Sequence, residues 1–242
     1  KLVRSRRAFT WLVALACLVG DATYAGGLRS LVALPLEPGG IVTRLQVVRA
    51  SSPDNTTVTG TVLYGLTTRQ TLIFSVPYRD LERGDDGFGY LTGLYRRTVY
   101  QHDEPNATRR IAVIGGLRVP TDSDLDPQIS AGLVATVYRR RSEWDFDLVW
   151  MEALGRSGNN ARYDVSWQYR LTPSEYPEWG IPTEWQSVIE LGGRYAEGSE
   201  MVHQLTVGAL WVHPSWVLET GIIQDLNGPD TTSFLLGIRK HF

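Results

Sequence analysis

Cysteine is nearly missing from this sequence of 242 residues, which contains Cys17 and no other. Cys17 lies in an N-terminal segment that we expect to be removed, so the remaining chain would hold no disulfide, no thiolate metal site and no cysteine nucleophile. Histidine is also scarce, and the four residues do not follow a spacing typical of a metal site or of a nucleophile with its base. We therefore expect a protein that is not an enzyme, with no catalytic residue, no metal and no cofactor.

Net charge and long apolar runs are limited as well. The formal net charge of -2 offers no basic surface for nucleic acid, so we expect no nucleic-acid partner. A mean hydropathy of -0.16 is too polar for a bundle of membrane helices, each of which needs about 20 apolar residues. Two classes remain: a secreted or soluble β protein, and a membrane β-barrel, whose sequence signal is weaker.

Residues 1–25 are typical of a secretory signal peptide. Basic residues at 1–7 precede an uncharged apolar run at 8–19, and Thr23 and Ala25 are small residues at the positions that a signal peptidase reads. We predict cleavage after Ala25. In an alternative interpretation, 14–17, which ends in Cys17, is a lipoprotein cleavage site.

Residues 26–39 form a second N-terminal region, which is rich in leucine but interrupted by Pro35 and Pro38. The region is apolar enough to be buried and too broken to form one long strand. Two interpretations stay open. It is either a periplasmic lead-in, with or without a short extra strand, or a plug that folds into the interior of a barrel.

From residue 40 to the end, apolar residues recur at every second position. In 144–154 and 161–171, aromatic and aliphatic residues occupy one face and charged residues the other. A period of two indicates strands with one apolar and one polar face. About twelve strands are predicted, with 10–14 as the range: 41–50, 56–66, 70–79, 87–99, 109–119, 128–139, 144–154, 161–171, 184–195, 202–212, 216–224 and 231–242. Residues 40–242 are therefore predicted to form an all-β, antiparallel up-and-down transmembrane β-barrel.

The connections support this fold in part. The second, sixth and tenth links are short, as expected when one end of a barrel faces the periplasm, whereas the fourth (about 100–108) and the eighth (172–183) are predicted to be longer. The last strand alternates and ends in Phe242, which resembles the terminal signature of bacterial outer-membrane barrels. We expect this strand to be recognised by the barrel-assembly machinery, and the barrel to sit in outer-membrane lipid.

The segment 115–121, with Gly115, Gly116, Pro120 and Thr121, resembles the Gly-x-x-x-Pro-Thr segment of outer-membrane proteins grouped as the MetA-pathway of phenol degradation family. Gly84-Asp85, the strand 202–212 and the terminal strand look similar too, so the resemblance covers roughly 40–242. Asp122 departs from the pattern, because the family usually has Gly there. The resemblance implies a barrel of the outer membrane associated with passage of small organic, often aromatic, compounds.

The polar faces of the predicted strands would line the interior of the barrel with charges of both signs. The pore-lining candidates are Arg110, Arg118, Asp145, Asp147, Arg162, Asp164, Arg170, Glu184, Glu190, Arg194, Glu219 and Arg239. They favour a passive or gated channel that orients a dipolar or anionic small organic solute. A paired network that rigidifies a closed structural or docking barrel is the alternative. A lipid-modifying enzyme is the second alternative, with Ser199 and His203 as its best residues.

Overall fold

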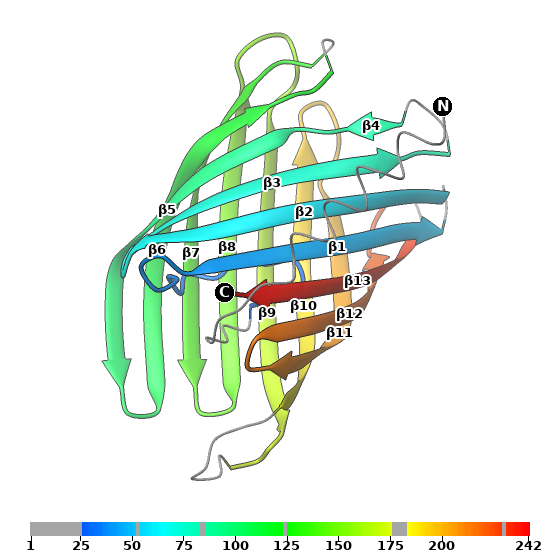
Figure 1. Ribbon diagram of the computed structural model, residues 1–242. Helices are drawn as coiled ribbons and strands as arrows, with labels where there is room; N and C mark the ends of the chain where they lie inside the picture. The colour runs from blue at the N-terminus through cyan, green and yellow to red at the C-terminus, as the bar shows by residue number, and fades with distance from the viewer. Residues whose placement is uncertain (1–25, 52–53, 83–85, 123–124, 176–182, 229–230) are drawn as a thin grey trace.

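The computed structural model describes residues 26–51, 54–82, 86–122, 125–175, 183–228 and 231–242. The predicted signal peptide therefore lies outside the described residues. All regular structure in the described part is strand (Figure 1): β1 (Ile41–Ser51), β2 (Asp54–Thr67), β3 (Gln70–Asp80), β4 (Gly87–Phe88), β5 (Leu91–Glu104), β6 (Ala107–Val119), β7 (Gln128–Arg139), β8 (Ser142–Ala153), β9 (Asn160–Thr172), β10 (Glu184–Ala196), β11 (Val202–His213), β12 (Trp216–Asp225) and β13 (Thr232–His241). Within that part, no helix is long and apolar enough to cross a membrane.

The sheet closes on itself. Each long strand pairs antiparallel with its sequence neighbour, and β1 pairs with β13 from Val42–His241 to Ala50–Ser233. Closure pairs the edges that an open sheet would expose. Twelve long strands therefore form one antiparallel barrel, and β4 is a two-residue addition to β3. The predicted fold class is confirmed.

One region of the prediction was wrong. The strand expected at 87–99 is divided into β4 and β5, and β5 continues to Glu104, so the fourth link is a two-residue turn at 105–106 and not a loop of about 100–108. The polar residues at 101–104 ended the apolar alternation, although their backbone still pairs with β6. The second, fourth, sixth and tenth links are thus all short, and 173–183 is the exception. We call this end of the barrel the short-turn end.

The two faces of the barrel wall have opposite character. In β8, Trp144, Leu148 and Trp150 are exposed, whereas Asp145 and Asp147 are 0% and 4% exposed. A soluble sheet does the reverse, because it buries its apolar face. An apolar outer face with a charged interior is the arrangement of a barrel that faces lipid.

Aromatic side chains gather on the outer face near the short-turn end. Trp185 stacks on Trp211 with ring centroids 5.6 Å apart, and Trp211 meets Trp216 edge to face at 4.9 Å. At the opposite end, the Tyr163 hydroxyl lies 2.8 Å from Nδ1 of His203. Aromatic side chains with a polar atom suit both interfaces of a bilayer, where one part of the ring is apolar and the other is wet.

Candidate functional site

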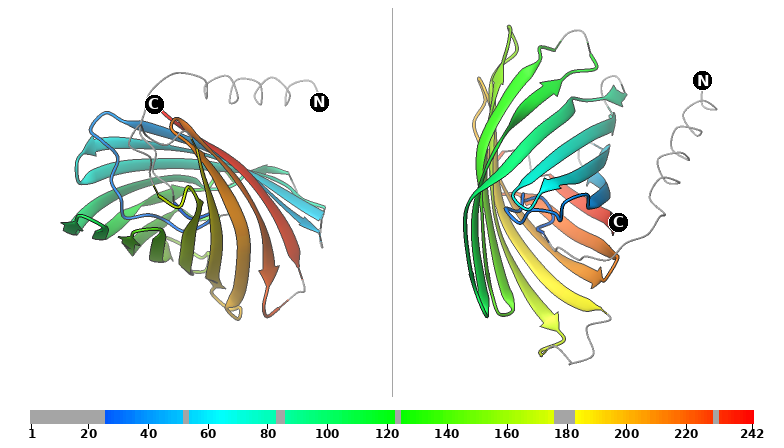
Figure 2. Two further views of the ribbon diagram at one scale, coloured as in Figure 1. Left: turned by 90° about the horizontal axis from the view of Figure 1, so that it is seen from below. Right: turned by 60° about the vertical axis from the view of Figure 1, so that its left-hand side comes forward.

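Residues 26–36 lie inside the barrel, and we call them the inner segment (Figure 2). With Gly26 and Gly27 at one end and Pro35 at the other, the segment forms no strand. Its backbone is buried all the same, so each of its N–H and C=O groups needs a partner. The wall of the barrel supplies many of these partners through side chains.

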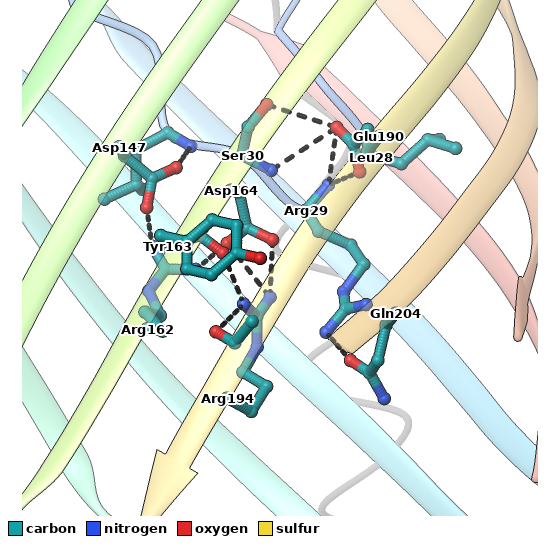
Figure 3. Close-up of polar contacts among 12 residues, drawn as sticks. Leu28, Arg29, Ser30, Asp147, Arg162, Tyr163, Asp164, Glu190, Arg194 and Gln204 are labelled. Carbon is teal, nitrogen blue, oxygen red and sulfur yellow. Dashed lines mark hydrogen bonds and ion pairs between the residues drawn. The ribbon is translucent and has the colours of Figure 1, made fainter. Parts of the chain in front are cut away.

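Acidic and hydroxyl side chains on one side of the lumen accept the N–H groups of the inner segment (Figure 3). Glu190 Oε2 accepts the N–H of Arg29 at 2.9 Å, and Asp147 Oδ2 accepts that of Leu31 at 2.7 Å. Further acceptors on this side are Glu190 Oε1 for the Ser30 hydroxyl at 3.1 Å and Thr136 Oγ1 for the Ala33 N–H at 2.9 Å. These acceptors come from β7, β8 and β10, which we call the acidic wall.

Basic side chains on the opposite side donate to the carbonyl groups. Arg239 Nη2 donates to the carbonyls of Gly26 and Gly27, each at 2.7 Å. Further donors on this side are Arg44 and Gln46 to Leu28, and Arg96 to Val32 and Leu34. The donors come from β1, β5 and β13, which we call the basic wall. The inner segment is thus held along both edges by side chains of the wall, acceptors on one side and donors on the other, without backbone pairing to the barrel.

Leu28 anchors the inner segment by packing. It is fully buried in a cluster with Val188, Leu210, Val217 and Leu235, all on the inner face of β10 to β13. Glycines at 208 and 221 leave room for it: a Cβ atom at those positions would lie 2.5 and 2.9 Å from Leu28 Cδ1. The wall therefore contains a recess shaped for one leucine.

Replacing Leu28 by alanine should release the inner segment. A buried Leu→Ala change costs about 2–5 kcal/mol, which here is lost from docking because the barrel wall itself is unaltered. At 1.4 kcal/mol per factor of ten, the undocked population should rise at least about thirtyfold. The measurement is the labelling rate of Ser30→Cys by a water-soluble maleimide. Leu236→Ala, on the exposed outer face of β13, is the matched control; equal labelling rates in the two backgrounds would contradict the prediction.

The inner segment leaves the lumen at the short-turn end through a close backbone contact. Gly39 N–H donates to the Gly65 carbonyl at 2.8 Å, and Gly65 N–H donates to the Gly40 carbonyl at 3.0 Å. Gly39 has φ of +81°, which favours glycine. A Cβ at Gly65 would collide with the Glu37 carbonyl. These contacts turn the chain from the lumen into the start of β1.

Ion pairs join the wall residues around the inner segment (Figure 3). Arg162 bridges Asp147 at 3.2 Å and Asp164 at 3.0 Å, and Arg194 pairs with Asp164 at 2.7 Å. Glu219 forms a second cluster with Arg44 at 2.6 Å and with Arg239, and its side chain is fully buried. Burying charges is tolerable only when they are paired and hydrogen-bonded, and these clusters meet that condition.

The structure places the twelve pore-lining candidates on the inward-facing positions of their strands, with different partners. Asp147, Glu190 and Arg239 bind the inner segment directly, and ion pairs join Asp147 to Arg162, Arg162 to Asp164 and Asp164 to Arg194. Arg239 also pairs with Glu219 in the second cluster. The other five lie apart: Asp145 with Thr136 and Gln168, Arg118 with Gln128, Arg110 with Asp103, Glu184 with Gln186, and the buried Arg170 near the short-turn end.

Sequence reasoning missed three arginines of the lumen. Arg44 was missed because β1 carries valines on its inner face and Arg49 on its outer face, which hides the alternation. Arg96 was missed because Arg97 follows it directly, and a bulge between Thr98 and Tyr100 shifts the alternation. Arg29 was missed because it belongs to the inner segment and not to a strand.

Burial, followed by repulsion from Arg194, lowers the pKa of Arg29 to about 10, so its guanidinium is charged at neutral pH.

The residues considered for catalysis have other partners. The His203 ring is hydrogen-bonded to the Tyr163 hydroxyl and tilted against the Tyr163 ring, so its hydrogen-bond partner is Tyr163 and not Ser199. His213 Nδ1 lies 3.5 Å from the Ser215 hydroxyl in the turn after β11, a pair that sequence reasoning missed. In the described residues, no group of three or more histidine, cysteine or acidic side chains is placed to hold a metal ion.

Comparison with known proteins supports the fold. No family model and no curated protein matches the sequence. Among solved structures, the COG4313 outer membrane channel from Pseudomonas putida F1 is similar, with 15% identity over 91% of this chain and 100% of that one, at a TM-score of 0.57. The KdgM porin in complex with disordered oligogalacturonate is 10% identical over 84% and 99%, with a TM-score of 0.49. At such low identity the first likeness establishes a shared barrel fold and nothing more. The TM-score of the second is too low to support a conclusion.

Proposed function

We propose that this protein is an outer-membrane channel for small organic solutes, and that the inner segment is its gate. The observation that carries the proposal is how the segment is held. Side chains bind it along both edges and a recess binds Leu28, but it pairs with no strand inside the lumen. It can therefore leave without breaking any hydrogen bond of the barrel wall. A segment that stayed in the lumen permanently would not need contacts that can break while the wall stays intact.

Several features support a place in the outer membrane. The outer face is apolar around the barrel, the interior is charged, and the predicted signal peptide would direct export. Phe242 pairs with Ile41 across the closing seam, and we propose that the barrel-assembly machinery recognises this terminal strand. The resemblance to the MetA-pathway of phenol degradation family extends the proposal to aromatic solutes.

The test is the conductance of the mature chain, refolded from residue 26 onward, in a planar bilayer. We expect brief, discrete openings from a mostly closed baseline, because the inner segment fills part of the lumen in its docked state. A small organic acid should reduce the current through open channels. A correctly folded, heat-modifiable barrel that never conducts would overturn the proposal in favour of a closed structural barrel.

A further inference from the structure

Beside the inner segment, the lumen keeps a cavity of about 370 Å³. The inner segment forms one side of it, and inward-facing residues of β1 to β3 and β5 to β9 form most of the other. Pockets that bind small organic molecules have volumes of roughly 300–1,000 Å³. The cavity is therefore large enough for a compact solute even while the inner segment is docked.

The charge of the lining is of one sign. Six arginines contribute to it: Arg29, Arg44, Arg96, Arg118, Arg162 and Arg239. Among the residues that the structure describes, the lining contains no aspartate or glutamate; the carboxylates that pair with Arg44, Arg162 and Arg239 are not part of it. An interior of low polarity strengthens the field of such charges relative to water.

Arg118 is the arginine best placed to bind a solute. Its printed contacts are neutral: Nη1 donates to Gln128 Oε1 at 2.6 Å and lies 2.9 Å from Met151 Sδ, and the guanidinium covers the Tyr90 ring at 4.5 Å. Within the described chain, no carboxylate pairs with it. By contrast, Arg162 in the same lining is bound to two aspartates.

Ser130 gives independent evidence for a ligand. It is 2% exposed, lines the same cavity, and its hydroxyl has no hydrogen-bond partner in the described structure. A buried polar group without a partner costs about 1–3 kcal/mol, so its presence calls for an explanation. Ser130 lies on β7 opposite Gly116, one inward position from the Arg118–Gln128 pair, so the free hydroxyl and Arg118 belong to one corner of the cavity.

Apart from the arginines, the lining combines serine and threonine residues, such as Thr59, Thr61 and Ser75, with a larger group of apolar side chains. The apolar group includes Leu31 of the inner segment, Ile73, Leu94, Val149 and Met151. A solute that fits this cavity therefore has a compact hydrocarbon body and one negatively charged end.

We propose that this cavity binds an organic monocarboxylate, with the carboxylate on Arg118 and the Ser130 hydroxyl and the hydrocarbon body against the aliphatic lining. This inference rests on the proposed channel function, and it names the class of solute. A guanidinium can give a carboxylate two parallel hydrogen bonds, and the hydroxyl supplies a third donor.

The test is equilibrium dialysis of radiolabelled hexanoate against the full mature barrel in detergent, with labelled hexanol as the neutral analogue of equal length. We expect saturable binding of hexanoate and much weaker binding of hexanol. Arg118→Gln should weaken hexanoate binding by at least about tenfold, since hydrogen bonds to charged groups contribute about 1.5–3 kcal/mol. Ser130→Ala should weaken it less. Arg49→Gln, at an exposed guanidinium paired with Asp54, is the matched control and should bind as the original chain does.

Three results would overturn the inference: no saturable hexanoate binding, equal binding of hexanol, or undiminished binding by Arg118→Gln. Heat-modifiable gel mobility verifies that each variant is folded. Equilibrium dialysis measures binding and does not depend on conduction, so the carboxylate site and the channel function can be contradicted independently. A barrel that conducts but does not bind hexanoate contradicts this inference alone, and one that binds hexanoate but never conducts contradicts the channel function.

Discussion

Deleting residues 27–36 from the mature chain should convert a mostly closed barrel into a continuously conducting one. The deletion removes all of the inner segment except Gly26 and leaves every strand pair in place, including the β1–β13 seam. We expect the time-averaged conductance in planar bilayers to rise at least about tenfold, because a docking free energy of only ~1.4 kcal/mol already keeps the lumen closed ten times as often as open. Water entering the lumen would solvate the exposed charges.

A pair of substitutions gives the matched control for this deletion. Glu190→Gln with Asp147→Asn keeps the inner segment but weakens the acceptors of its N–H groups, so we expect more frequent openings at an unchanged barrel size. A conductance between that of the original chain and that of the deletion variant would show that weakened docking opens the lumen less often than removal of the segment does. If the deletion variant folds and conducts no more than the original chain, the inner segment is not the gate.

The second large effect is expected from Glu219→Gln. The Glu219 side chain is fully buried between Arg44 and Arg239. Removing one partner of a buried ion pair costs about 3–5 kcal/mol, because the remaining charge has no compensation; here two guanidiniums are left. The midpoint of urea unfolding should fall accordingly, as followed by tryptophan fluorescence of the refolded barrel.

Asp54→Asn is the control for this substitution. It breaks the Arg49–Asp54 pair at 2.8 Å, where both side chains are more than half exposed, so we expect no measurable change in stability. A Glu219→Gln variant as stable as Asp54→Asn would show that the cluster contributes no net stability. The double variant Glu219→Gln with Arg44→Gln should recover part of the loss, since one unpaired charge is then removed.

The strands could be predicted where the two faces differ most. In β8 and β9, lipid-facing aromatics alternate with inward carboxylates and arginines, and the predicted bounds differ from the observed ones by two residues or fewer. The alternation fails in β5, where the adjacent Arg96 and Arg97 put a charge on each face, a bulge follows between Thr98 and Tyr100, and a polar end still pairs with β6. Periodicity reports on a face only while the register is regular.

The position of the inner segment could not be derived from sequence. Its partners, such as Glu190 on β10 and Arg239 on β13, lie more than 150 residues away along the chain. Each partner looks like an ordinary inward charge until the barrel brings opposite walls together. Leucines and prolines at 28–38 indicated burial, but they are equally consistent with a lead-in outside the barrel, so sequence alone left both interpretations open.

The route of the inner segment has a consequence for the order of assembly. The segment precedes β1 in the chain, yet it binds residues of β1, β5, β8, β10 and β13 at once. That set of partners exists only after the last strand has joined the first. The inner segment, which is synthesised before every strand, is therefore the last part of the barrel to reach its native position, and its protection from proteases marks the moment at which the barrel has closed.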